Sequence, residues 1–340
     1  MALKDKRFAF FFPGQGAQYP GMALDFLESE GRPPHAGTAV KALFDLASRV
    51  IGEDMEALIG YTDEATLMRT DVSQPAITLA NLAAAAYLGE LGVKPAACAG
   101  FSLGEYAALT VAGVISPEDC FRLVKERGKF MQEAADRLRA EAPPAGENGD
   151  STQDTAPGMA AVIGLAPEQV EAIIAELTAS GLSGLYAANI NSSRQVVISG
   201  TAAALMEGAR RFKAAGARRV LRLRVAGPFH SPLIAGAAEK FRPVLEGAAF
   251  KDPVLPLFSN VTGRRVSSGE EAKKLALEQI TKAVRWTEEE KSLNDAGGFD
   301  AVLETGPGKV LQGLWKDCGS TLPCYPAGTV KDIDTISNGE

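Results

Sequence analysis

Residues 100–104 (GFSLG) have the Gly-x-Ser-x-Gly form in which a sharp turn presents a serine as a nucleophile. The apolar run 94–99 before it predicts a buried strand, and residues 103–114 after it predict a tightly packed helix. The N–H of Leu103, at the predicted helix start, would point to where an oxyanion forms in acyl transfer. The pattern favours Ser102 as a nucleophile; the alternative is an incidental serine in a glycine-rich turn.

A serine nucleophile needs a base, and the chain has two histidines. His35 lies in a stretch rich in glycine and proline (31–37) that is poorly suited to hold an imidazole rigidly. His230 lies between two prolines, directly after the alternating, strand-like run 219–225. The sequence therefore predicts His230 as the general base, with a hydrogen-bonded loop histidine as the alternative.

The elements around these residues predict a large α/β domain. Residues 8–12 (FAFFF) predict a buried first strand, and the loop 13–18 follows it. Two glycines flank Gln15 in this loop, so that its backbone can approach a ligand closely and expose N–H groups; the alternative is a plain strand-to-helix turn. Residues 254–258 predict a further strand of this domain.

Residues 159–225 show a different pattern, with short elements in the order β-α-β-β-α-β, which is typical of a ferredoxin-like unit. We therefore predict a large α/β-hydrolase-like domain with an inserted small ferredoxin-like subdomain, and a site between the two. The predicted boundaries are residues 1–136 and 227–330 for the discontinuous large domain, 137–226 for the subdomain with a flexible loop at 141–157, and 331–340 for a polar, frayed tail.

Composition excludes several classes of protein. The 340 residues are 46% hydrophobic and carry a net charge of −7, which argues against a nucleic-acid partner. The four cysteines have no zinc-like spacing and are expected to be buried thiols in a reducing compartment. No stretch is long and apolar enough for a signal peptide or a membrane span. We predict a cytoplasmic monomer with no membrane partner.

Beyond these patterns, the chain resembles the malonyl-CoA:acyl carrier protein transacylases over residues 8–314. Eight sequence blocks carry the resemblance, in the expected order: PGQGAQYPGM (13–22), SQPAI (73–77), GFSLGEYAAL (100–109), RGKFMQEA (127–134), GPFHSPL (227–233), SNVTG (259–263), Gln279 with VRW (284–286) and ETGPGKVLQGL (304–314). The resemblance implies that Ser102 takes the malonyl group from malonyl-CoA with His230 as base. The phosphopantetheine thiol of an acyl carrier protein then takes it from Ser102, by ping-pong kinetics, in support of fatty acid elongation. It implies no cofactor and no metal.

The resemblance also assigns supporting residues. The N–H groups of Gln15 and Leu103 would form the oxyanion hole. Arg127 would bind the malonyl carboxylate with its guanidinium fork; the alternative is an ordinary ion pair with Glu126 or Glu133. The main-chain carbonyl of Gln279 would orient His230, which gives a Ser–His dyad without a triad acid.

Two further residues are assigned to substrate binding, Phe229 and Asn191. Phe229 is bulky and should crowd the α-carbon of the acyl group, which favours malonyl over methylmalonyl. Phe101 departs from the histidine that many relatives carry before the nucleophile. A basic run could dock an acidic carrier protein, although alternating arginines are also typical of a solvated face. It consists of Lys213, Arg218, Arg219, Arg222 and Arg224.

Three other functions remain open from the sequence. A serine esterase or thioesterase could use the same Ser102 turn. A trans-acting polyketide acyltransferase would differ only in its extender unit. A non-catalytic protein that binds malonyl-CoA would keep the fold without needing Ser102 or His230.

Overall fold

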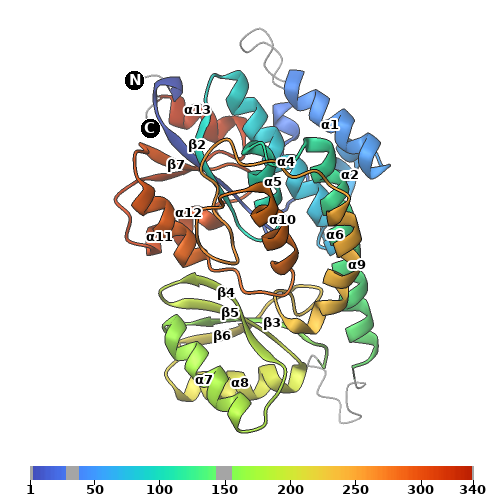
Figure 1. Cartoon of the computed structure of the whole chain (residues 1–340), viewed down its shortest axis with the longest axis vertical. Helices are drawn as coiled ribbons and strands as arrows, with labels where there is room; N and C mark the ends of the chain where they lie inside the picture. The colour runs from blue at the N-terminus through green and yellow to red at the C-terminus, as the bar shows by residue number, and fades with distance from the viewer. Residues whose placement is uncertain (1–2, 28–37, 143–154, 339–340) are drawn as a thin grey trace.

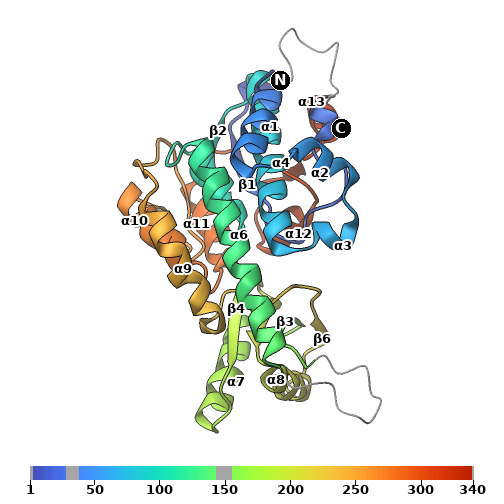
Figure 2. The same ribbon diagram turned by 90° about the vertical axis from the view of Figure 1, so that its right-hand side faces the viewer.

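The computed structural model describes residues 3–27, 38–142 and 155–338, with a large α/β part above a smaller sheet (Figure 1). His35 and residues 143–154, most of the predicted loop 141–157, lie outside the described residues. Helix α6 (Pro117–Ala140) runs from the large part down to the small sheet (Figure 2), so the boundary predicted at 136/137 falls inside one continuous helix.

The large part is built on a four-stranded parallel sheet. Its strand order is β2 (Pro95–Gly100), β1 (Phe8–Phe12), β7 (Ala301–Glu304) and β8 (Cys324–Pro326). All five residues of β1 are buried, because Phe8, Phe10 and Phe12 belong to one core cluster and Ala9 and Phe11 to another on the opposite face. Helices cover both faces of the sheet, which explains the unbroken apolar run.

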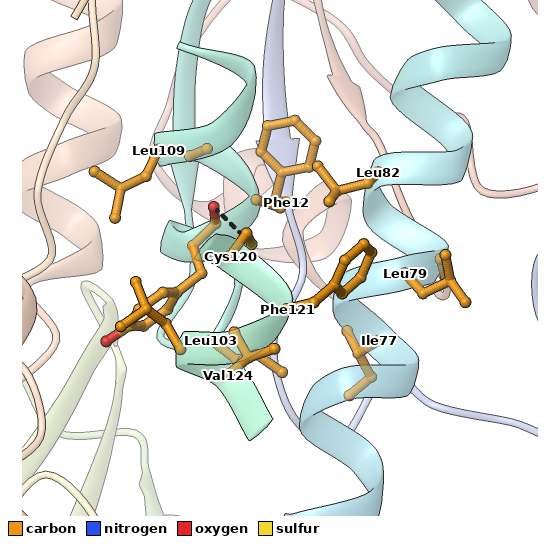
Figure 3. Packing of buried hydrophobic residues seen from close by; sticks show 14 of the residues in the cluster. Phe12, Ile77, Leu79, Leu82, Leu103, Leu109, Cys120, Phe121 and Val124 are labelled. Atoms are coloured by element: carbon orange, nitrogen blue, oxygen red, sulfur yellow. Dashed lines mark hydrogen bonds between the residues drawn. The ribbon is translucent and has the colours of Figure 1, made fainter. Parts of the chain in front are cut away.

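One face of the sheet packs against α4 (Thr70–Glu90), α5 (Gly104–Val111) and α6. Figure 3 shows Phe12 in this layer near Leu82 of α4 and Phe121 of α6, all of which are buried. On the other face, the Phe11 ring contacts Trp286 and Trp315 edge to face, at centroid distances of 4.9 and 5.3 Å. These tryptophans belong to α11 (Trp286–Ala296) and α12 (Val310–Asp317).

The remaining elements of the large part surround this core. They are η1 (Leu3–Asp5), η2 (Leu24–Phe26), α1 (Thr38–Ile51), α2 (Met55–Tyr61), α3 (Glu64–Leu67), η3 (Pro232–Ile234), α9 (Ala235–Glu246), α10 (Gly269–Glu278) and α13 (Val330–Asn338). The strand predicted at 254–258 does not form; instead, two isolated bridges join Leu257 to Cys98 and Phe258 to Arg265. Pro256 within this stretch, and Pro253 just before it, lack the N–H groups that a strand ladder needs. Cys318 is exposed, whereas the other three cysteines are buried as predicted.

The prediction of a frayed polar tail at 331–340 is wrong for the residues that the structure describes. Helix α13 (Val330–Asn338) begins where the Val330 N–H donates a hydrogen bond to Asp25 Oδ2 at 2.6 Å. In this helix, Ile333 is fully buried in the core cluster that contains Phe12, and Ile336 packs against the same cluster. Apolar residues at intervals of three give even this short polar sequence one buried face.

The small sheet has the predicted β-α-β-β-α-β element order. Its elements are β3 (Gly158–Ile163), α7 (Pro167–Ala179), β4 (Leu185–Ser192), β5 (Gln195–Gly200), α8 (Ala202–Ala214) and β6 (Arg219–Arg222). The strands are antiparallel neighbours in the order β4-β5-β3-β6. Strand β6 ends three residues earlier than predicted. No helix in the described part of the chain is long and apolar enough to cross a membrane.

Glycines allow the turn at Ser102 to sit tightly against β1. A Cβ atom at Gly104 would lie 1.9 Å from the Phe12 carbonyl oxygen, and one at Gly100 would lie 2.2 Å from the Gly104 carbonyl carbon. These are contacts with backbone, which a side-chain rotation cannot relieve. Helix α5 can therefore start directly above β1 only because Gly104 has no side chain.

We predict that Gly104→Ala destabilises the protein by about 3 kcal/mol or more, because the added methyl group overlaps backbone atoms. Gly89→Ala is the matched control, since that glycine is also helical and a Cβ there meets nothing within 4 Å. The measurement is the urea midpoint of unfolding for both variants. Equal midpoints would contradict the steric argument.

Candidate active site

The turn after β2 holds Ser102 in a conformation that is rare for a residue with a side chain. Ser102 has a φ of 51°, in the left-handed region. Its N–H donates a hydrogen bond to Asn260 Oδ1 at 2.6 Å, and Asn260 Nδ2 donates to the Gly100 carbonyl at 2.6 Å. One amide side chain thus bridges both sides of the turn and holds the strained residue in place.

His230 lies next to the serine hydroxyl, as predicted. Its Nε2 is 2.8 Å from Ser102 Oγ, and its Nδ1 is 2.8 Å from the Gln279 carbonyl oxygen. The carbonyl can only accept, so Nδ1 carries the hydrogen and Nε2 is left to accept the serine proton. Burial and the nearby charge of Arg127 lower the pKa of His230 to about 4. The imidazole is therefore neutral at pH 7 and ready to act as a base.

The orienting partner of His230 is a main-chain carbonyl. Gln279 is the residue that ends α10, where backbone carbonyls have no partner within the helix. In residues 3–27, 38–142 and 155–338, no carboxylate is hydrogen-bonded to His230. The arrangement is a Ser–His dyad completed by a neutral acceptor.

Two backbone N–H groups near Ser102 are free. Within the described residues, neither the Gln15 N–H nor the Leu103 N–H donates a hydrogen bond to the protein. The loop that carries Gln15 lies against the turn, because a Cβ at Gly14 would be 2.3 Å from the Phe101 carbonyl oxygen and 3.5 Å from the Leu103 nitrogen. Free donors beside a nucleophile can stabilise an oxyanion.

Arg127 is the most unusual charge in the molecule. It is only 1% exposed, yet its guanidinium is held by two neutral groups, Gln74 Oε1 at 2.8 Å from Nη1 and Gln279 Oε1 at 2.9 Å from Nη2. Its Nε has no partner, and the guanidinium lies 5.4 Å from the centre of the Tyr106 ring. Burial lowers the pKa of Arg127, without removing its charge.

The alternative of an ordinary ion pair for Arg127 is wrong. Glu133 pairs with Lys240 at 2.7 Å, and no carboxylate in the described ranges lies within ion-pair distance of Arg127. A buried guanidinium without an anion is costly, since burial removes its hydration. The arrangement is suited to receive an anionic ligand.

Buried carboxyl groups accept hydrogen bonds from the amide side chains of the site. Gln279 Nε2 donates to Glu105 and, at 3.0 Å, to the Ser102 carbonyl. Asn260 Nδ2 donates to Glu289 at 2.7 Å. Burial raises the pKa of Glu105 to about 7 and that of Glu289 well above its usual range. The two carboxyl groups thus orient the amides of Gln279 and Asn260. These amides in turn hydrogen-bond to Arg127 and to the backbone of Ser102.

A cavity of about 250 Å³ joins these residues, between the large part and the small sheet. Six of the eight predicted site residues line it: Gln15, Ser102, Arg127, Asn191, Phe229 and His230. Leu103 and Gln279 do not line it but contact residues that do. Asn191 Oδ1 is buried without a partner. In the described part of the chain, no cluster of three His, Cys, Asp or Glu side chains could hold a metal ion.

Four residues of the site were not singled out in the sequence. They are Gln74, Glu105, Asn189 and Asn260. Asn189 lies two residues before Asn191 on β4 and also lines the cavity, which the period of two in a strand could have indicated. The other three act through contacts with distant residues, which no local spacing reveals.

Comparison with known proteins identifies the family. Residues 9–172 match the acyl transferase domain family. The malonyl CoA-acyl carrier protein transacylase of Bacillus subtilis strain 168 is 36% identical over 332 residues, which cover 97% of this chain and 95% of that protein. The chain belongs to this family. The resemblance stated from the sequence blocks is thereby confirmed.

Other transacylases are similar to this chain over nearly its whole length. The malonyl CoA-acyl carrier protein transacylase of Escherichia coli K12 is 37% identical over 319 residues, which cover 93% of this chain and 94% of that protein. A solved malonyl-transacylase in complex with a type II polyketide-synthase acyl-carrier protein is 35% identical, with a TM-score of 0.84. The match covers 98% of this chain and all of that one, so the mixed α/β fold is that of the transacylases.

The state of His230 predicts the pH dependence of acylation. Because the folded site holds its pKa at about 4, the base form persists well below the ordinary value of 6.5. As the pH is lowered from 7, we expect kcat/KM for acyl loading to stay constant past pH 6.5 and to fall only as the pH approaches about 4. Stopped-flow release of CoA across this range measures it. An acid limb with its midpoint at or above 6.5 contradicts the assignment.

Proposed function

We propose that this chain transfers the malonyl group of malonyl-CoA to the phosphopantetheine thiol of an acyl carrier protein, through an ester on Ser102. One observation carries the proposal: a buried, unpaired guanidinium at Arg127 lines the same cavity as the Ser102–His230 pair. A carboxylate is the group that a guanidinium fork binds best, and an acyl group that ends in a carboxylate places one at this position. The names of the relatives support the same reaction.

In the first half-reaction, Ser102 Oγ attacks the thioester carbonyl as His230 Nε2 takes its proton. The negative charge that forms on the carbonyl oxygen is received by the N–H groups of Gln15 and Leu103. Each such donor is worth about 100- to 1,000-fold in rate. The carbon–sulfur bond then breaks, CoA leaves with the proton from His230, and the malonyl ester remains on Ser102.

The second half-reaction reverses these steps with a different thiol. The phosphopantetheine sulfur attacks the ester carbonyl while His230 takes the thiol proton, and the ester oxygen leaves with that proton to restore Ser102. One acyl-enzyme shared by two half-reactions gives ping-pong kinetics. The steps are thioester exchange alone and require no cofactor or metal.

Two cavity residues are proposed to select the acyl group. Phe229 is 5% exposed and its main-chain carbonyl accepts a hydrogen bond from Ser199, which fixes its position. Its ring would meet a methyl group on the α-carbon, so that methylmalonyl is disfavoured. Asn191 offers an unpartnered Oδ1 to an N–H of the pantetheine arm.

The competing functions are weakened by specific observations. A serine esterase has no need of the buried Arg127, and a non-catalytic binding protein has no need of the Ser102–His230 contact. A polyketide-type role remains a second candidate, because one solved relative is bound to a polyketide-synthase carrier protein. Malonyl is the extender unit that Phe229 favours in either pathway.

We also propose the finer architecture. The parallel sheet with helices on both faces and a nucleophile turn after β2 supports an α/β-hydrolase-like domain formed by residues 1–136 and 227–330. The order β4-β5-β3-β6 with two helices supports a ferredoxin-like subdomain within 137–226. The absence of disulfides among the four cysteines, all in the described ranges, supports a cytoplasmic location.

Intact mass after brief mixing with malonyl-CoA tests the reaction. We expect a single malonyl adduct on the wild type that moves to holo carrier protein, and none on Ser102→Ala. Arg127→Ala should lose at least about 100-fold in kcat/KM for malonyl-CoA, because the carboxylate loses a charged fork. Arg127→Lys is the matched control, since it keeps the charge without the fork.

Other outcomes would replace the proposal. Free malonate that accumulates without carrier protein would establish a hydrolase instead. Malonyl loading that Arg127→Ala leaves unchanged would remove the carboxylate-binding role.

The carrier protein is proposed to dock on the edge of the small sheet. Arg219 on β6 pairs with Ile163, which pairs with Gln195, and Gln195 lines the cavity. Both Arg219, the first residue of this edge strand, and Arg218, directly before it, are exposed. Positive charge here would attract an acidic carrier protein toward the site.

Charge reversal tests this docking surface. Arg218→Glu with Arg219→Glu should raise KM for the carrier protein about tenfold and leave loading from malonyl-CoA unchanged, because rim charges act mainly on encounter. The control is the same double reversal at Arg264 and Arg265, which are exposed neighbours on the large part. Equal carrier kinetics for the two double variants would reject the surface.

A further inference from the structure

The buried guanidinium of Arg127 is oriented by two amides, and we propose that one of them, Gln74, is a specificity-determining positioning residue. Its neutral amide oxygen orients Arg127 without neutralising it, so that the positive charge stays available for the carboxylate of the acyl group. The inference rests on the proposed function and extends it to a residue that does not line the cavity.

The contacts of Gln74 allow one orientation of its amide. Gln74 lies in α4, is fully buried, and places Oε1 2.8 Å from Arg127 Nη1. A guanidinium has only donors, so the oxygen must face it. The Nε2 of Gln74 donates instead to Met131 Sδ at 3.4 Å, which is a weak acceptor. The strong hydrogen bond of this side chain is therefore the one to Arg127.

The neutrality of Gln74 matters because of where the charge lies. A carboxylate at this position would form a buried ion pair with Arg127 and would repel a second carboxylate that entered the cavity. The buried carboxyl groups of the network are Glu105, which contacts the Gln279 amide, and Glu289, which contacts the Asn260 amide. Among the described residues, neither makes an ion pair with Arg127. Amide oxygens thus orient the guanidinium, and an amide side chain separates it from the carboxyl group of Glu105.

Gln74 can be tested separately from Gln279, the other amide. The Gln279 side chain also donates to Ser102 and Glu105, and its carbonyl holds His230. A change there would disturb the nucleophile and the base together. Within the part of the chain that the structure describes, the side-chain hydrogen bonds of Gln74 go to Arg127 and Met131 alone, so a change there acts on the guanidinium.

Gln74→Glu places a carboxylate where the amide oxygen lies and should neutralise Arg127. We expect kcat/KM for malonyl loading to fall about 10- to 100-fold, the loss of one charged hydrogen-bonded contact, with most of the change in KM. Loading from acetyl-CoA, which brings no carboxylate, should hold or rise. The measurement is the initial rate of ester formation on Ser102 by intact mass with each thioester, and the thermal midpoint reports folding.

Gln74→Met is the matched control, since it has similar length and no charge. It should lower malonyl loading severalfold by loosening Arg127 but keep the preference for malonyl over acetyl. If Gln74→Glu kept the wild-type ratio of the malonyl loading rate to the acetyl loading rate, the inference would be overturned. If Gln74→Glu does not fold, unchanged malonyl kinetics in Gln74→Met would overturn it, since the amide oxygen would then position nothing. A wild type that loads no malonyl group fails the proposed function itself.

Discussion

The end of helix α10 is the constraint on which the site depends. Gln279 closes this helix, so its carbonyl has no partner within the helix and is free to accept the hydrogen of His230 Nδ1. Its side chain reaches the Ser102 carbonyl and the guanidinium of Arg127. One residue thus fixes the tautomer of the base, one side of the nucleophile turn and the orientation of the charge that faces the cavity.

In the proposed mechanism, the same helix end takes the place of a triad acid, which the described residues do not supply to His230. The carboxyl end of a helix carries partial negative charge, which stabilises a cation that lies against it. His230 becomes such a cation only while it holds the proton of Ser102 or of a thiol. Arg127 opposes this, because its charge lowers the pKa of the same imidazole. Under the proposed function, a bound carboxylate would offset part of that opposition, so an anionic acyl group would assist the base as well as fill the cavity.

Local sequence patterns predict most of the helices and strands. The hydrogen-bonded pairs of the site and helix α13 depend instead on contacts between residues far apart in the sequence. The FAFFF strand, the turn at Ser102 and the succession of helices and strands in residues 158–222 could be predicted because each element is encoded within a few neighbouring residues. The pairing of Gln74 with Arg127 spans 53 positions and that of Asn260 with Ser102 spans 158, so neither leaves a local signal. Helix α13 was mistaken for a tail because its stability comes from Asp25 and the core rather than from its own polar sequence.

The low pKa of the buried base also bears on which acceptor would take the acyl group. In the proposed second half-reaction His230 takes the proton of the acceptor, so an acceptor that gives up its proton readily is favoured. A thiol with a pKa of about 8.5 meets this condition far better than water with a pKa of about 15.7. The thiol is also the better nucleophile toward the ester carbonyl. The neutral carbonyl that orients His230 does less than a carboxylate would to raise its basicity. Under the proposed function, this would keep the ester on Ser102 slow to hydrolyse until a thiol arrives.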